Sequence, residues 1–103
     1  VAFSSDWPIA PLDPFLGMQA AMTAKPLRRD CTSQAQTLMD SLHAFTLAGA
    51  HMEFMEDRKG MLKPGYLADV IVLDADLERT PPGAVGGVKP VVTICDGRVT
   101  FER

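Results

Sequence analysis

The segment KGMLKPGYLADVIVLD at residues 59–74 limits the folds open to this chain more than any other. Pro64 presets φ for the first central position of a β-turn, and Gly65 supplies the positive φ that a type II turn needs next. Val70 to Leu73 is an unbroken run of β-favouring residues, which is typical of a strand covered on both faces. The segment therefore predicts a tight turn followed by a buried strand.

The chain before this segment has the period of helices. Asp13 followed by Pro14 predicts a helix start, because Asp is a preferred N-cap and Pro is tolerated at the first helical position. Apolar residues recur at helical spacing over residues 15–24, and Pro26 ends the pattern. The mixed polar stretch at residues 27–36 is expected to be a loop.

A second helix is predicted after this loop. Thr37 and Asp40 resemble a capping box, in which the side chain of each residue accepts the backbone N–H of the other. The helix is expected over residues 38–49, with one or two further turns over residues 50–55. Gly60 is expected to end the helical half of the chain.

Beyond Gly60 the period changes to that of strands. Strands are predicted at residues 61–62, 68–74, 91–95 and 98–101. Asp96 and Gly97 form a two-residue hairpin signal between the last two of these strands. Residues 77–89 are rich in Pro and Gly and are expected to form an irregular connection or a surface loop.

Composition and charge argue against two classes of partner. The formal net charge is −3 and no cluster of Lys and Arg is present to bind phosphates, so nucleic acid is not an expected partner. No apolar run approaches the ~20 residues of a membrane-spanning helix, so no membrane partner is expected either. Cys31 and Cys95 are too few for a disulfide framework, and we expect two free thiols in the cytoplasm.

Two motifs in this chain resemble those of a known family. Residues 60–72 follow the pattern Gly-x-Leu-x-Pro-Gly-x-x-Ala-Asp and then three hydrophobic residues. This pattern resembles a signature of the amidohydrolase superfamily that marks where the chain leaves the catalytic barrel for a small β-domain. Residues 5–14, SDWPIAPLDP, resemble the segment after the last barrel strand in the family 3 branch, which includes hydrolases of N-acyl and N-formyl amines. The chain is identified as a C-terminal segment of this family.

The resemblance implies an α+β fold in two parts. Residues 1–58 correspond to the last strand and flanking helices of the (β/α) barrel, and the apolar residues 1–3 are expected to end that buried strand. Residues 59–103 correspond to a small antiparallel β-sheet that is part of a β-sandwich domain. With 103 residues, the chain is far shorter than the roughly 250 residues of a complete barrel, so we expect it to be the tail of a larger enzyme.

Asp6 is the candidate catalytic residue. The resemblance implies that this aspartate contacts the metal and takes the proton of the attacking water. A metal lowers the pKa of its bound water towards neutrality, and a carboxylate can then accept the proton. The residues alone also allow a plainer role, in which Asp6 caps the turn before Trp7 and Pro8.

A complete metal site is not expected in the isolated chain. Hydrolytic zinc sites use three or more protein ligands, mostly His, and the resembled family takes its His-X-His pair from earlier barrel strands. The histidines of this chain are His43 and His51, predicted in the helical region and too far apart along the helix axis to share an ion easily. A divalent metal, with zinc the first choice, is expected at Asp6 only where an intact enzyme supplies the missing ligands.

Two functions from different classes fit these features. The first is the C-terminal part of a metal-dependent amidohydrolase, which hydrolyses amide-type C–N bonds of a small-molecule substrate with metal-activated water. The isolated chain would then be inactive. The second is a non-catalytic structural or interaction module that self-associates.

Self-association is predicted from the apolar stripes of the two helices. Their large side chains are Phe15, Met18, Met22, Leu38, Leu42 and Phe45. Leaving one such side chain exposed forfeits about 1.5–3 kcal/mol relative to burying it. The whole set exceeds what a small domain can lose from a net stability of roughly 5–15 kcal/mol. We therefore expect a homo-oligomer, most simply a two-fold dimer.

Overall fold

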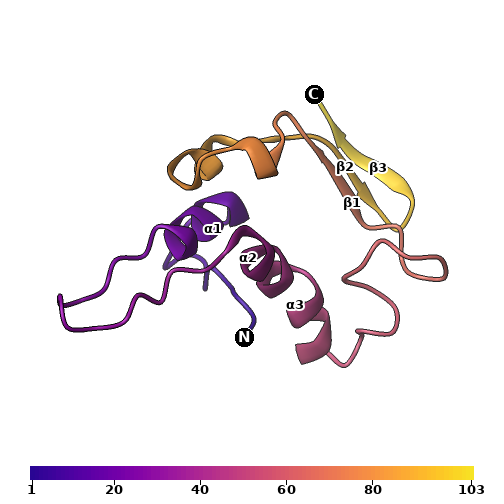
Figure 1. Ribbon diagram of the computed structural model, residues 1–103. Coiled ribbons are helices and arrows are strands. Elements are labelled where there is room, and N and C mark those ends of the chain that lie inside the picture. The colour runs from indigo at the N-terminus through magenta and orange to yellow at the C-terminus, as the bar shows by residue number, and fades with distance from the viewer.

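The computed structural model describes all 103 residues and places three helices beside a three-stranded antiparallel sheet (Figure 1). The helices are α1 (Pro14–Met22), α2 (Leu38–Phe45) and α3 (Leu47–Met52), and the strands are β1 (Val70–Leu73), β2 (Pro90–Cys95) and β3 (Arg98–Glu102). Two 3₁₀ helices, η1 (Leu77–Arg79) and η2 (Pro82–Gly87), connect β1 to β2. The predicted α+β class is confirmed. None of the helices combines the length and the apolar composition that a membrane-spanning segment requires.

The start of α1 is confirmed where the sequence placed it. The Asp13 carboxylate accepts the backbone N–H of Phe15 at 3.0 Å, and Pro14 is the first helical residue. The helix ends at Met22, two residues earlier than expected. The backbone N–H of Thr23 still makes the regular helical bond to the carbonyl of Gln19 at 2.9 Å, and the Thr23 hydroxyl donates to the same carbonyl at 2.7 Å. A Thr side chain that bonds to the carbonyl four residues earlier slightly destabilises a helix at that point.

The capping box at the start of α2 is also confirmed. The Thr37 hydroxyl accepts the backbone N–H of Asp40 at 3.1 Å, and the Asp40 carboxylate accepts that of Thr37 at 3.4 Å. The prediction of one helix over residues 38–49 is wrong, because the helix breaks at Thr46. The Thr46 hydroxyl donates to the carbonyl of Leu42 at 2.7 Å, and its backbone leaves the helical region with φ −123° and ψ −91°.

A long loop separates α1 from α2. It runs over residues 23–37 and projects away from the body of the chain (Figure 1). Its two ends are fastened together, since the backbone N–H of Gln36 donates to the carbonyl of Ala21 at 2.9 Å. The loop is therefore an excursion that leaves and returns at one point on the surface.

The turns of the β-region have the predicted conformations. Gly65 has φ 88°, and the N–H of Tyr66 donates to the carbonyl of Lys63 at 3.0 Å, as in a type II turn. Asp96 and Gly97 have φ 47° and 75°, which is the conformation of a two-residue hairpin turn between β2 and β3. The strand order is β1-β2-β3, so β1 and β3 are the free edges of the sheet.

Three strand predictions are corrected by the structure. Residues 61–62 and residues 1–3 form no strand, because no neighbouring strand in this chain pairs with them. The run Val70–Leu73 does form β1, but it is not covered on both faces. Ile71 is 49 % exposed and Val72 is 47 % exposed. Every residue of β3 is exposed as well.

The buried core lies between α1 and η2. It consists of Phe15, Met18, Val85 and Val88, with side chains of α2, β1 and η1 packed around it. The connection over residues 77–89 is therefore not a surface loop, because Val85 is 0 % exposed and Val88 is 3 % exposed. Gly86 permits this close approach, since a Cβ there would lie 2.8 Å from Gln19 Oε1 and 2.9 Å from Leu16 Cδ2.

Self-association was expected because the apolar helix residues were predicted to be exposed, and the structure does not show that exposure. Phe15 and Met18 are buried within the chain, so they need no partner. The other members of the predicted stripes pack partly buried around the same cluster, namely Met22, Leu38, Leu42 and Phe45. The sequence suggested exposed stripes because residues 85–88 lie far along the chain from the helices that they cover.

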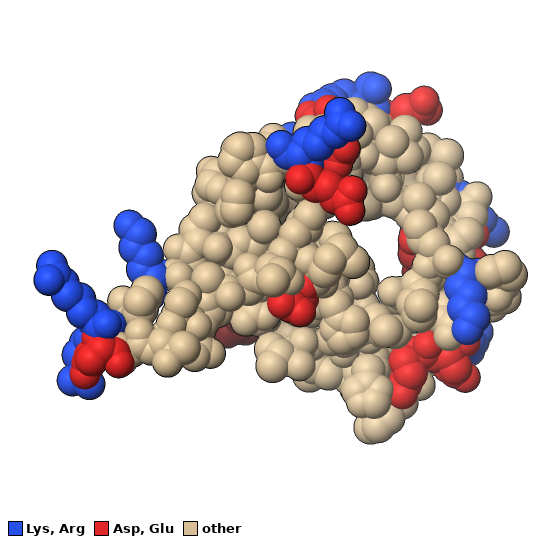
Figure 2. Space-filling view, viewed as in Figure 1, with Lys and Arg blue, Asp and Glu red and all other residues tan.

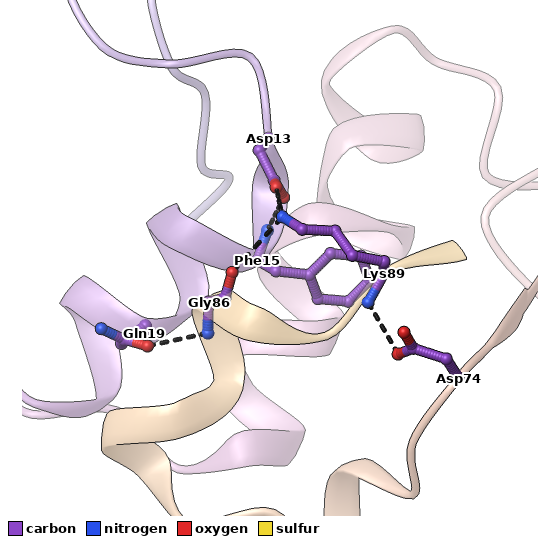
Figure 3. Close-up of polar contacts among 6 residues, drawn as sticks. All are labelled: Asp13, Phe15, Gln19, Asp74, Gly86 and Lys89. Carbon is purple, nitrogen blue, oxygen red and sulfur yellow. Dashed lines mark hydrogen bonds and ion pairs between the residues drawn. The ribbon is translucent and has the colours of Figure 1, made fainter. Parts of the chain in front are cut away.

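Polar contacts around Lys89 tie α1 to the sheet (Figure 3). The Lys89 Nζ donates to the Asp13 carboxylate at 2.5 Å, and its backbone N–H donates to the Asp74 carboxylate at 2.9 Å. Gln19 of α1 accepts the backbone N–H of Gly86 at 2.8 Å. The residue that caps α1 therefore also binds the residue that precedes β2.

An opening separates α3 from the sheet (Figure 2). The pocket at this place has a volume of ≈ 440 Å³. Gly49 and Ala50 of α3 line one side, and Val70 and Ile71 of β1 line the other. The free edge of β1 thus faces a space that this chain leaves unfilled.

Candidate functional site

Asp6 lies on a tight turn that follows an irregular segment, residues 1–5. The N–H of Ile9 donates to the carbonyl of Asp6 at 2.9 Å, and the N–H of Ala10 donates to that of Ser5 at 3.2 Å. The peptide bond between Trp7 and Pro8 is cis. Asp6 itself has φ 46°, in the left-handed region that Asp tolerates better than most residues. Local hydrogen bonds therefore define the conformation of the turn.

The carboxylate of Asp6 does not cap this turn. It accepts no hydrogen bond and forms no ion pair, and the residue is exposed. The Ser4 hydroxyl instead accepts the backbone N–H of Asp6 at 3.3 Å. The plainer role expected from the sequence is thus not seen, and both carboxylate oxygens are free for a group outside the turn.

Phe3 connects the Asp6 segment to α2. Its backbone N–H donates to the carbonyl of Ala44 at 3.1 Å, and its ring meets that of Phe45 edge-on, with centroids 5.6 Å apart and planes at 67°. Nothing in the sequence pattern singles out this pair, because its members lie more than forty positions apart. This contact between the Asp6 segment and α2 could therefore not be predicted from local sequence.

His43 and His51 line a second, open pocket of ≈ 530 Å³. The break at Thr46 places them on separate helices, α2 and α3, and both helices line this pocket. His51 Nδ1 lies 2.8 Å from Oε1 of Glu56. A hydrogen bond from the backbone N–H of Glu56 and then the contact with His51 hold the pKa of the Glu56 carboxyl below its usual value.

The side chains of this chain do not fit a metal ion by themselves. Nowhere do three or more His, Cys, Asp or Glu residues lie close enough together to hold one. Asp6 offers one carboxylate, whereas hydrolytic zinc sites use three protein ligands. A metal at Asp6 therefore needs ligands from outside these 103 residues. Cys31 and Cys95 are exposed free thiols.

Comparisons with known proteins support the same family as the two motifs. The model of the Amidohydrolase family matches residues 1–101. The protein YtcJ of Bacillus subtilis is 27 % identical over 107 residues, which cover 99 % of this chain. The protein LONG AFTER FAR-RED 3 of Arabidopsis thaliana is 32 % identical over 79 residues, or 74 % of this chain. An imidazolonepropionase of Kosmotoga olearia is 29 % identical over 91 residues, or 88 % of this chain.

A solved structure shares the fold. The crystal structure of an amidohydrolase from Thermotoga maritima MSB8 matches with a TM-score of 0.76 at 24 % identity. The match covers 99 % of this chain and 23 % of that chain. At this level of identity the likeness describes the arrangement of the elements alone.

The fold and the comparisons together define a segment of a hydrolase fold, and the chain belongs to the amidohydrolase family. The resemblance seen at residues 5–14 and 60–72, to a C-terminal segment of the family 3 branch, is thereby confirmed. The chain spans 20 %, 14 % and 20 % of the length of the three curated relatives.

Proposed function

We propose that this chain is the C-terminal part of an enzyme that hydrolyses amide-type C–N bonds, and that Asp6 belongs to its catalytic site. The match of the family model over residues 1–101 carries the proposal. The imidazolonepropionase among the relatives supports a C–N bond of a small molecule as the target. N-acyl and N-formyl amines are the substrates to test first.

The state of Asp6 suits proton transfer. A general base must reach the proton that it abstracts, and a carboxylate already engaged by the protein would compete poorly for it. The Asp6 carboxylate is exposed and without partners, while its backbone is held in the turn by Ser4 and Ile9. Asp6 would accept a proton from the attacking water. A divalent metal, zinc by first choice, would be completed by ligands from the rest of the enzyme.

The remainder of the enzyme would also complete the sheet. We assign residues 1–58 to the barrel and residues 59–103 to the small β-domain. Strand β1 lies at an edge of the sheet, and a pocket of ≈ 440 Å³ lies beside it. Apolar side chains on an unpaired edge are an aggregation hazard unless another strand covers them. A strand from elsewhere in the complete enzyme would fill this place.

The test of the catalytic role uses the complete protein that carries this segment. Asp6→Asn keeps the size of the side chain but removes the base, so we expect hydrolysis of an N-acyl amine to fall by about 100-fold or more. The matched control is Asp57→Asn, an exposed aspartate in the bend before Gly60, which should leave the rate unchanged. An Asp6→Asn enzyme within about threefold of the unmodified rate would contradict the proposal.

The predicted homodimer stays a prediction. The helix side chains no longer support it, because they pack within the chain. The sheet, however, exposes other apolar side chains, among them Ile71, Val72, Val99 and Phe101. Light scattering on the 103-residue chain gives its mass directly. A mass of one chain at high micromolar concentration would exclude the dimer without touching the assignment of Asp6.

A further inference from the structure

Residues 1–13 carry Asp6 but contain no helix or strand of their own. The turn from Asp6 to Ile9 is closed by local hydrogen bonds, which set its conformation. Such bonds do not set where the turn lies relative to the helices. That position depends on contacts between the segment and the rest of the chain.

The aromatic contact of Phe3 with Phe45 is one such contact, and Phe45 has further contacts of its own. Its ring meets that of Phe3 and also approaches the backbone of α1 at Gly17. A Cβ on Gly17 would lie only 2.8 Å from Cζ of Phe45, so the ring occupies the place that a side chain at position 17 would need. Phe45 also packs against the core cluster of α1 and η2. Phe45 thus connects Phe3 to the core, so the position of Phe3 depends on that of the ring.

The space next to this contact is loosely filled. A pocket of ≈ 210 Å³ lies between the Asp6 segment and α1. Its lining includes Ser4 and Ser5 from the segment, Gly17 from α1, and Phe45. A smaller side chain at position 45 would enlarge this pocket, and the segment could then move inward. The ring of Phe45 therefore supports the segment where other packing is sparse.

We propose that Phe45 is a positioning residue for Asp6, acting through Phe3. The inference rests on the proposed function, because it matters for catalysis only if Asp6 takes part in the reaction. Catalytic groups need placement within roughly 0.5 Å, and a misplacement of about 1 Å can cost a factor near 100 in rate. In this role Phe45 sets the position of the Asp6 segment and takes no part in the chemical step.

The enzyme arm of the test compares Phe45→Ala and Phe45→Leu with Leu77→Ala in the complete protein. Leu77 packs against the same core cluster from η1, so it reports a loss of core packing without the contact to Phe3. We expect Phe45→Ala to lower kcat by roughly tenfold or more with KM within about threefold, and Phe45→Leu to retain part of the rate. Leu77→Ala should lower the melting temperature with kcat within about threefold. Equal losses of kcat in Phe45→Ala and Leu77→Ala would overturn the proposal.

The second arm measures amide hydrogen exchange in the same complete protein and needs no activity. The Phe3 amide bonds to Ala44, whereas the Ile9 amide bonds within the turn. Phe45→Ala should speed exchange at Phe3 by about tenfold or more and leave Ile9 unchanged, while Leu77→Ala should affect Phe3 no more than the core amides. Unchanged exchange at Phe3 would overturn the anchoring role. Should Asp6→Asn prove active, the proposed function fails, and this arm still decides whether Phe45 holds the segment.

Discussion

The helical region and the sheet differ in how much of their apolar surface the chain itself covers. On α1, Phe15 and Met18 are buried against η2, whereas the residues of β3 are all exposed. Only 9 of 103 residues are buried in total, and the radius of gyration is 14.8 Å, above the roughly 13 Å typical of a compact chain of this length. The helices thus have a buried core within the chain, whereas the sheet leaves several of its apolar side chains exposed.

This difference follows from where each region finds its partners. The core of α1 is closed by residues 82–88 of the same chain, which return to the helix after β1. The sheet pairs only with itself, in the order β1-β2-β3, and its outer edges have no neighbour. A fragment of a larger fold thus keeps its order where contacts return within it, and exposes apolar surface where they do not.

The largest predicted effect breaks the helical core. Val85 is 0 % exposed, and Val85→Asp would place an unpaired charge there, so we expect a loss of about 3–5 kcal/mol and an unfolded chain. Its counterpart on the sheet, Val99→Asp, should change the free energy of unfolding by no more than about 0.5 kcal/mol, because Val99 is 59 % exposed. Urea unfolding followed by circular dichroism measures both. Similar losses at the two positions would remove the distinction between the regions.

A second substitution tests the junction between the regions. Gly60 has φ 91°, and a Cβ there would lie 2.9 Å from Ala50 Cβ and 3.0 Å from Leu47 Cα. Gly60→Ala combines a left-handed backbone with a clash against α3, and we expect a cost of about 2–4 kcal/mol. Gly83→Ala is the control, since nothing lies within 4 Å of a Cβ at that position. If Gly60→Ala and Gly83→Ala unfolded at the same urea concentration, α3 would not pack against Gly60 as described.

Acidification should weaken both regions through different carboxylates. Hydrogen bonds from the side chain and then the backbone of Thr37 lower the pKa of Asp40 below 3.8. The backbone N–H of Lys89 and then Arg103 do so for Asp74. A lowered carboxyl pKa contributes stability that is present above 3.8 and lost as the pH falls through the folded-state value.

The two carboxylates can be separated by substitution. Asp40→Asn should reduce the acid sensitivity of exchange in α2, and Asp74→Asn that of β1 and β2. Hydrogen exchange at about pH 6 and about pH 3 tests this. A single substitution that changes the acid response of both regions equally would mean that they unfold as one unit.

The smallest predicted effect concerns the end of α3. Phe54 has φ 59° and is 86 % exposed, and the N–H of Met55 donates to the carbonyl of Ala50 at 2.9 Å. This is the Schellman arrangement, in which Gly is the preferred residue at the position that Phe54 occupies. Phe54→Gly should stabilise the chain by about 0.5–1 kcal/mol, while Phe54→Ala should not, since Ala keeps the strained backbone. Thermal unfolding that ranks the two variants the other way would refute this account.

Sequence reasoning succeeded where the signal lies within a few neighbouring residues. Asp13 and Pro14 start α1, and Asp96 and Gly97 turn the last hairpin, because caps and turns are local chemistry. It failed at Thr46, whose hydroxyl competes for a helix carbonyl, and at Val85, whose burial depends on a helix some seventy positions earlier.

The candidate site divides in the same way. The motif at residues 5–14 was enough to propose Asp6 as a site residue. The contact between Phe3 and Phe45 joins residues far apart in the sequence, so no local pattern predicts it. No group of three or more His, Cys, Asp or Glu residues lies together in this chain, so no pattern within it could define a complete metal site.

The loop over residues 23–37 leaves and returns at one point, where Gln36 bonds to Ala21. Lengthening such a loop adds only the entropy of closing a longer ring, about 0.6 kcal/mol for each doubling. A fluorescent protein or an epitope could therefore be inserted at its tip, beside the exposed Leu27, without strain on α1 or α2. An insertion of this kind would let the complete protein be followed in a cell while the helices that flank the loop keep their packing.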